Sequence, residues 1–150
     1  MKKLARLAVV VSSALLVGCA SVPMASTTLD SEAKKFAPEP GKANIYVNRG
    51  GGMGTALVFQ TVLDGRIVGS LAPNTYQLLS VSPGEHTVTM TGVENVQQEK
   101  VTAETGKNYF FRVSVHMGWM AGRVHIEPVN DEQGRKQVMG SKRAETTSYQ

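Results

Sequence analysis

The chain has one cysteine, Cys19, among its 150 residues. A single thiol cannot form an intramolecular disulfide, and no second cysteine exists to complete a cysteine-ligated metal site. Aromatic residues make up only 6% of the sequence, and no apolar run approaches the roughly twenty residues that a membrane-spanning helix needs. With 41% hydrophobic residues, the chain provides one small domain, which must be stable without disulfides.

Clustered positive charge is also missing from most of the chain. The formal net charge is +4, but Lys2, Lys3 and Arg6 supply three of the 16 basic residues. The remaining 13 basic residues face 12 acidic ones and are scattered. Because nucleic-acid-binding proteins gather basic residues on one face or one helix, we expect no nucleic-acid partner.

The first 18 residues have the three-part pattern of a secretory signal peptide. A basic start is followed by an apolar run over residues 7–17, which only Ser12 and Ser13 interrupt. This run suits the apolar region of a signal peptide and is too short to cross a bilayer. A buried N-terminal helix would explain the Ala and Leu content, but not the basic start or the polar chain that follows. The sequence therefore predicts a signal peptide over residues 1–18.

Leu16-Val17-Gly18-Cys19 resembles the lipobox of bacterial lipoproteins. The resemblance implies cleavage between Gly18 and Cys19 and a diacylglyceryl thioether on Cys19, which only a thiol can form. One acyl chain binds a membrane weakly, at about 0.8 kcal/mol per buried CH₂, whereas several chains hold a protein firmly. The alternative is a free, buried cysteine that acts as a small hydrophobic residue.

The residues after the cysteine indicate a destination. They are Ala20 and Ser21 rather than the aspartate that retains lipoproteins in the inner membrane. By the same resemblance, the expected location is the outer membrane, with a lipid-anchored domain that faces the periplasm. Exposure at the cell surface stays open as an alternative.

Composition divides the rest of the chain into three parts. Residues 19–42 are rich in Ser, Thr, Ala and Pro, which predicts a lipidated N-terminus and flexible tether. A short helix over residues 29–36, capped by Asp30 or Ser31, is its only expected element. Residues 43–129 alternate short apolar runs with turn signals and form the expected domain. Residues 130–150 are polar and predict a loose C-terminal tail.

Residues 43–129 predict about eight strands and no helix. Apolar residues alternate along several runs, with Ile45 and Val47 on one face of the first. Asp64-Gly65 is a strong two-residue hairpin signal. Residues 96–102 are mostly polar, which suits an edge strand protected by charge. We therefore expect an all-β fold, a single small antiparallel β-sandwich of immunoglobulin or transthyretin type.

No arrangement of residues predicts catalysis. No serine lies in a G-x-S-x-G turn, and no thiol remains once Cys19 is lipidated. The glycine-rich residues 50–54 precede a strand rather than the helix that a phosphate-binding loop needs. Carboxylates such as Glu94 lie in turns, where we expect solvation. We therefore expect no catalytic residue, no enzymatic activity and no cofactor.

His116 and His125 are the candidate metal ligands. Both lie on the polar face of neighbouring predicted strands, close to Glu127, and two imidazoles with a carboxylate can bind zinc. Arg112 and Arg123 share that face and disfavour a cation. The preferred interpretation is a solvated sheet face with an Arg112–Glu127 pair, without a metal site.

Residues 117–122 contain the only tryptophan, Trp119, close to Met117 and Met120. An exposed loop of this composition would be an interaction loop for a protein partner or a lipid surface. The alternative, which we prefer, is that Trp119 folds back to close the end of the sandwich. A small domain has few large residues with which to close its core.

Three stretches within residues 43–129 carry a wider resemblance. They are NIYVNRG, LDGRIVGSLAPNTYQLLSVSPGEHTVTM and GKNYFFRVSV, the last followed by a return strand. The chain resembles a family of small bacterial lipoproteins whose domain has no assigned function. The middle stretch is also similar to PEGA-type β-domains in its hairpin and turn chemistry. Neither resemblance implies catalytic residues.

These expectations together predict an outer-membrane-anchored periplasmic lipoprotein that is a non-catalytic binding or scaffolding module. Its expected partners are the membrane, through the lipid on Cys19, and an envelope protein. The alternative is an accessory lipoprotein of an envelope or secretion assembly, by analogy of fold alone. A periplasmic enzyme is the third and disfavoured alternative.

Overall fold

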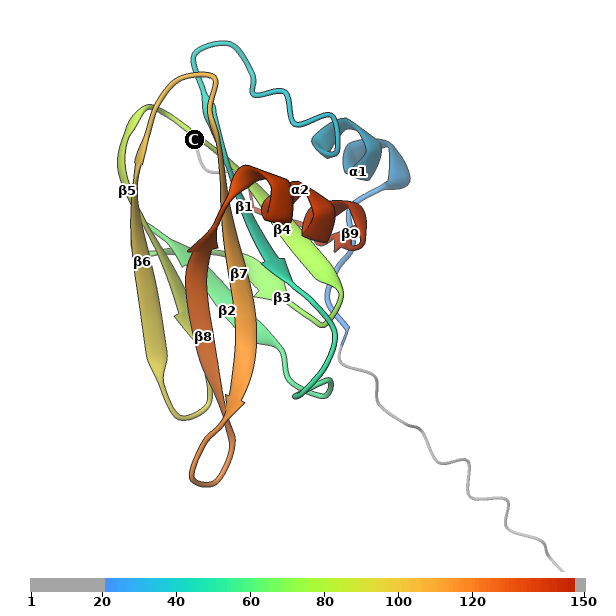
Figure 1. Ribbon diagram of the computed structural model, residues 1–150, viewed down its shortest axis with the longest axis vertical. Coiled ribbons are helices and arrows are strands. Elements are labelled where there is room, and N and C mark those ends of the chain that lie inside the picture. The colour runs from blue at the N-terminus through green and yellow to red at the C-terminus, as the bar shows by residue number, and fades with distance from the viewer. Residues whose placement is uncertain (1–20, 148–150) are drawn as a thin grey trace, which may run out of the picture.

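The computed structural model describes residues 21–147, so the predicted signal peptide, Gly18 and Cys19 lie outside the described residues. The described chain forms two β-sheets and two short helices (Figure 1). The elements are α1 (Thr27–Ala33), β1 (Ala43–Arg49), β2 (Phe59–Leu63), β3 (Arg66–Leu71), β4 (Thr75–Val81), β5 (Gly84–Thr91), β6 (Val96–Ala103), β7 (Asn108–Met117), β8 (Gly122–Val129), α2 (Asp131–Met139) and β9 (Lys142–Arg143).

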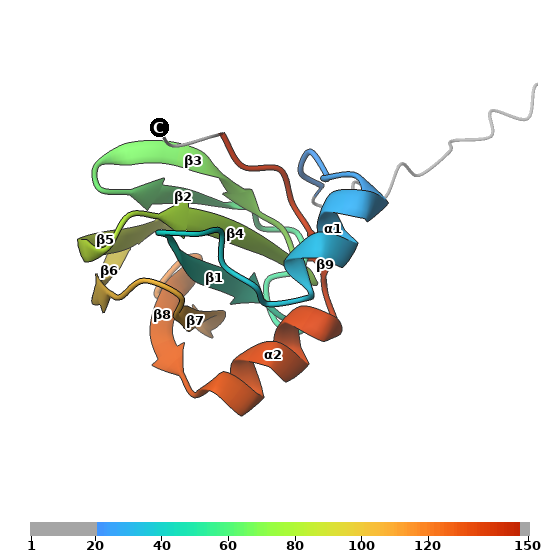
Figure 2. The same ribbon diagram turned by 90° about the horizontal axis from the view of Figure 1, so that it is seen from above.

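The two sheets pack face to face (Figure 2). One has the strand order β8-β7-β1-β4-β9 and the other β3-β2-β5-β6. Most neighbours are antiparallel, although β1 runs parallel to β7 and β4 parallel to β9. Every residue of the range 43–129 is described, and that range contains eight strands and no helix. The predicted all-β sandwich is therefore confirmed, and β6 is an edge strand as expected.

The main core lies between the sheets, where alternate residues of each strand point inward. It includes Ile45 and Val47, the two residues predicted to share one face, together with Val88, Met90, Phe111, Val113, Val124 and Ile126. The Asp64-Gly65 hairpin is also confirmed. Both residues have positive φ, 49° and 81°, as a tight turn between antiparallel strands requires.

Both helices lie on the outer face of the five-stranded sheet (Figure 2). A second apolar cluster lies between them and this face. The rings of Tyr46 and Phe110 stack with centroids 5.0 Å apart. Ala33 of α1 and Val138 of α2 cover them. Burial raises the pKa of Tyr46 to about 12, and its hydroxyl donates a hydrogen bond to the Ala33 carbonyl at 2.7 Å. Both faces of β1 are therefore covered.

The described part of the predicted tether packs on the domain instead of forming a flexible linker. The helix α1 begins two residues earlier than expected, and Ser26 caps it by accepting a hydrogen bond from the Leu29 N–H at 3.2 Å. Phe36 packs against the second cluster, with its ring 5.4 Å from that of Tyr46. Average composition misses this packing because a few well-placed apolar residues are enough to attach the segment.

The predicted loose tail is also wrong for its described part, which ends at residue 147. Asn130 caps α2 by accepting a hydrogen bond from the Gln133 N–H at 2.9 Å. Gly134 and Val138, four residues apart, are buried against the sheet. One buried stripe is sufficient to attach a helix that is otherwise polar. Neither helix in the described part of the chain is long and apolar enough to cross a membrane.

Candidate functional site

Four loops meet at one end of the sandwich, which we call the loop end. They are residues 50–58, 72–74, 92–95 and 118–121, which join β1 to β2, β3 to β4, β5 to β6 and β7 to β8. In one sheet, β1 is parallel to β7, and β4 and β8 are antiparallel to these two strands, so β1 and β7 end where β4 and β8 begin. In the other sheet, β2 pairs antiparallel with β3 and β5 pairs antiparallel with β6. The loop 118–121 projects furthest and is the lowest point of the fold in Figure 1.

Glu94 holds the projecting loop in one shape. Its carboxylate accepts hydrogen bonds from the backbone N–H groups of Trp119 at 3.0 Å, Met120 at 2.6 Å and Ala121 at 2.5 Å. The Gly118 N–H closes the turn by donating to the Ala121 carbonyl at 2.9 Å. These hydrogen bonds lower the pKa of Glu94 below its ordinary value, and the bond from the Met120 N–H has the largest effect. The expectation of a merely solvated carboxylate is therefore wrong.

The large side chains of this loop point into solvent. Trp119 is 94% exposed, Met120 88% and Met117 81%. The preferred expectation that Trp119 closes the sandwich is wrong. Glu94 fixes the loop backbone away from the core, and other groups close this end, as the contacts of Arg49 show.

Arg49, the last residue of β1, closes the loop end from inside. It is 2% exposed, and its guanidinium lies 4.6 Å from the centre of the Phe59 ring. It donates to the carbonyls of Leu57 at 2.5 Å, Gly54 at 2.6 Å and Leu71 at 3.3 Å. Burial lowers the pKa of its guanidinium. A sequence argument misses this role because an arginine before a glycine-rich loop looks solvent-exposed.

The loop end also collects most of the exposed apolar surface. The described residues have eleven exposed large apolar side chains, and eight of these lie in or beside the four loops. The eight are Met24, Met53, Val58, Val93, Val96, Met117, Trp119 and Met120. Such a surface is able to bind an apolar partner.

The histidines lie on the outer face of the β7–β8 hairpin, as predicted. The rings of His116 and His125 meet edge to face, with centroids 5.3 Å apart. Arg112 Nε donates to Glu127 Oε1 at 2.8 Å, which confirms the predicted pair and lowers the pKa of Glu127. Within residues 21–147 no group of three or more His, Cys, Asp or Glu side chains is placed to hold a metal ion.

A third histidine forms a cluster that sequence reasoning did not find. His86 Nδ1 lies 2.6 Å from Asp64 Oδ2, and its Nε2 lies 2.7 Å from the Ser82 carbonyl. Asp64 also accepts a hydrogen bond from the Thr87 N–H at 2.7 Å. Both ring nitrogens are occupied, so the cluster ties the β2–β3 turn to β5 and leaves no nitrogen free for a substrate.

A polar groove of about 460 Å³ lies between α2 and the end of β1. Its lining includes Asn48, Asn74, Arg112, Gln133, Lys136 and Ser141. Asn48 Nδ2 donates to Ser141 Oγ at 2.7 Å. Carboxamides and cations of this kind can hold a polar or anionic small molecule. No local signal could have predicted the groove, because its residues come from distant segments.

The geometry can now be compared with known proteins. Residues 39–126 match the family described as "Protein of unknown function (DUF2846)". The chain belongs to this family. A Haemophilus influenzae protein described as "Uncharacterized protein" is 32% identical over 135 residues, which cover 89% of this chain and 80% of that protein. The resemblance to a domain without assigned function is therefore confirmed. The DUF2846 match includes all four loops of the loop end and excludes both helices.

Proposed function

We propose that this DUF2846 protein is a lipid-anchored, non-catalytic binding module of the outer membrane that faces the periplasm and docks through its loop end. Cleavage after Gly18 makes Cys19 the first residue, and lipid on Cys19 anchors the chain. The docking residues are Met117, Trp119 and Met120.

The braced loop is the observation that carries this proposal. Three backbone hydrogen bonds to Glu94 fix the loop before any partner binds, while Trp119 remains 94% exposed. Preorganisation reduces the conformational entropy that binding would otherwise cost. Tryptophan and methionine are enriched at binding surfaces, where they contribute a large apolar contact area.

The shifted carboxylates of the described residues support a non-catalytic role. Glu94 braces the loop, Glu127 pairs with Arg112, and Asp30 holds α1 to the sheet. In each case the hydrogen bonds that lower the pKa come from groups that shape the fold. These carboxylates are therefore accounted for by structural contacts.

The anchor is tested with Cys19→Ser. We expect the wild-type chain to incorporate palmitate, to carry diacylglycerol by mass spectrometry and to sediment with outer membranes. The Cys19→Ser chain should lose the lipid. If it still labels with palmitate, the proposed lipidation site is wrong.

Docking is tested by placing a photo-crosslinking amino acid at position 120 in living cells, with position 67 as the control. Ile67 is 60% exposed at the start of β3, at the opposite end of the sandwich. We expect crosslinks from position 120 and none from position 67. Equal yields at the two positions would contradict docking by the loop end. One stoichiometric protein at position 120 would favour the accessory role in an envelope assembly.

A further inference from the structure

The chain between Cys19 and the folded domain is short. The Pro23 carbonyl accepts a hydrogen bond from the Glu145 N–H at 2.8 Å, and the Ala25 N–H donates to the Arg143 carbonyl at 3.0 Å. Between them, Met24 forms a β-bridge with Ala144. The chain from Cys19 to Pro23, even if fully extended, spans at most about 14 Å.

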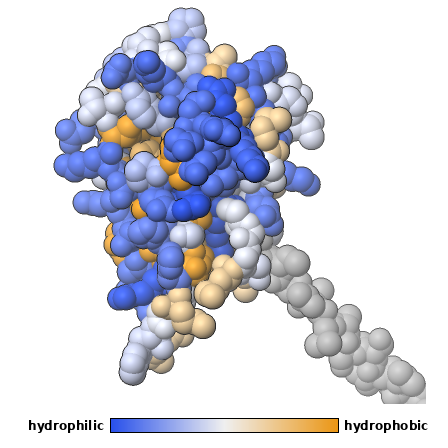
Figure 3. Space-filling model, viewed as in Figure 1, coloured by the Kyte–Doolittle hydropathy of each residue, from blue (hydrophilic) through white to orange (hydrophobic). Residues whose placement is uncertain are grey.

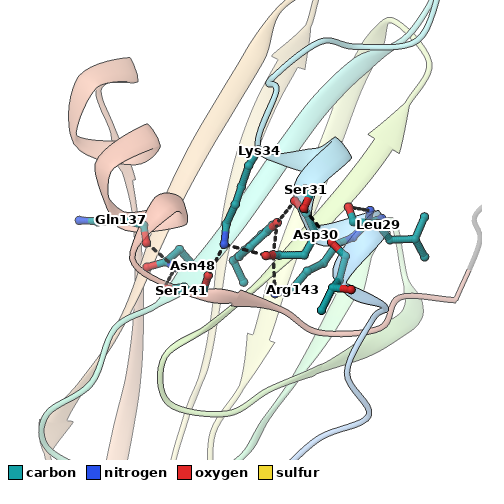
Figure 4. Close-up of polar contacts among 10 residues, drawn as sticks. Leu29, Asp30, Ser31, Lys34, Asn48, Gln137, Ser141 and Arg143 are labelled. Carbon is teal, nitrogen blue, oxygen red and sulfur yellow. Dashed lines mark hydrogen bonds and ion pairs between the residues drawn. The ribbon is translucent and has the colours of Figure 1, made fainter.

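Side-chain contacts attach the next segment, which includes α1, to the rest of the domain. Asp30 accepts hydrogen bonds from the Tyr76 hydroxyl at 2.8 Å, the Arg143 N–H at 3.0 Å and Lys34 Nζ at 2.8 Å. Lys34 Nζ also donates to the Ser141 carbonyl at 2.8 Å, and Figure 4 shows Lys34 reaching between Asp30 and Ser141. Residues 23–36 are therefore part of the domain and do not add to the length of the linker.

This segment enters the fold at the loop end. Ser21, Val22 and Met24 line one hollow together with Pro73 and Asn74 of the loop 72–74. In Figure 1 the first described residues and the loop 118–121 both lie in the lower half of the view, whereas the α1–β1 connection is at the top. A lipid on Cys19 therefore brings the loop end, rather than the opposite end, toward the bilayer.

The two ends of the sandwich differ in charge. The four loops of the loop end contain one ionisable residue, Glu94, whose carboxylate is engaged by the loop backbone. Connections at the opposite end carry Lys42, Asp64, Glu104 and Lys107. Figure 3 shows pale and orange residues at the lower tip, below a mostly blue upper face. Arg123, at the start of β8, lies beside these loops with its side chain exposed and its Nε 3.8 Å from Glu94 Oε2. The connections at the loop end therefore carry fewer of the charges that resist transfer into lipid than those at the opposite end do.

We infer that the partner of the loop end is the lipid bilayer itself, with Trp119 and Met120 inserted in the interfacial layer beside the anchor. Tryptophan favours this layer because its ring is both apolar and able to donate a hydrogen bond. Amphipathic elements that bind this layer lie about 5–10 Å deep, a depth that the short connection to Cys19 permits. This inference rests on the proposed lipidation of Cys19.

The single tryptophan provides a direct test. The lipidated chain is reconstituted into phosphatidylethanolamine–phosphatidylglycerol vesicles, with or without lipids brominated near the top of the acyl chain. We expect Trp119 emission to shift to the blue and to lose intensity with brominated lipid. The matched control combines Trp119→Phe with Ile67→Trp, which places the fluorophore at the opposite end. Its emission should be that of water-exposed tryptophan, without quenching by bromine.

The outcomes separate this inference from the proposed function. If mass spectrometry shows lipid on Cys19 but Trp119 emits as in water, the anchor stands and bilayer contact is refuted. If Trp119 emission is blue-shifted in the vesicles but brominated lipid does not quench it, the ring is buried away from lipid and bilayer contact is refuted as well. If Cys19 carries no lipid and bromine does not quench Trp119, both proposals fail.

Discussion

Replacing Asp30 by alanine should detach α1 from the sheet. The carboxylate accepts hydrogen bonds from the Tyr76 hydroxyl, the Arg143 backbone and Lys34 Nζ. Its side chain is only 22% exposed and that of Lys34 only 18%, so water does not fully screen these contacts. Burial raises the pKa of Asp30, but the hydrogen bonds from Lys34 and Tyr76 outweigh this effect and leave the pKa lowered. The carboxylate is therefore charged at neutral pH.

The expected cost follows from these contacts. A hydrogen bond to a charged group contributes roughly 1.5–3 kcal/mol, but contacts that share one carboxylate do not add. The Tyr76 hydroxyl retains a longer contact of 3.3 Å with the Asp30 carbonyl, and Lys34 retains Ser141. We therefore expect the free energy of unfolding to fall by about 3 kcal/mol, which lowers the melting temperature of a domain of this size by about 10 °C.

The assay compares Asp30→Ala with Glu32→Ala on the same helix. Glu32 pairs with Lys35 at 2.6 Å, but these side chains are 58% and 62% exposed, and such pairs contribute less than about 1 kcal/mol. Thermal unfolding gives the stability, and trypsin cleavage after Lys34 and Lys35 reports release of α1. Melting temperatures within about 2 °C of each other, with equal resistance to trypsin, would refute the argument that residues 23–36 belong to the domain.

Two further predictions concern packing and pH. Gly134→Ala should lower the free energy of unfolding by about 2 kcal/mol despite the higher helix propensity of alanine, because the added Cβ would lie 2.5 Å from Phe110 Cδ1. Gly140→Ala should leave the free energy of unfolding unchanged, because its added Cβ would lie 3.6 Å from the nearest atom. Equal midpoints of urea unfolding for the Gly134→Ala and Gly140→Ala chains would contradict this prediction. Because the pKa of Glu94 is lowered in the fold, the brace should be complete above about pH 4.5 and be lost as pH falls through the lowered value. Glu94→Gln should loosen the loop at neutral pH, and a Met120 amide signal that does not titrate in acid would refute the brace.

The strands could be predicted because their signals are local. Alternation of apolar residues placed Ile45 and Val47 in the core, and the Asp64-Gly65 turn fixed the β2–β3 hairpin. The polar run of residues 96–102 correctly indicated an edge strand. The helical attachments were missed because each depends on a few side chains. Val138 and Gly134 fit the ring of Phe110, which is distant in the chain, and mean composition does not record that match.

The sequence by itself determined the all-β class, the strand faces and the presence of an unusual Trp–Met loop. It could not determine where that loop points. The orientation depends on Glu94, whose carboxylate reaches from the β5–β6 turn to the backbone of residues 119–121 in the β7–β8 loop. Arg49 closes the loop end from inside, so the core does not need Trp119. Tertiary structure decided these features because Glu94 binds a loop 25 residues away and Arg49 also reaches the Leu71 carbonyl, 22 residues away, and neither contact has a local sequence pattern.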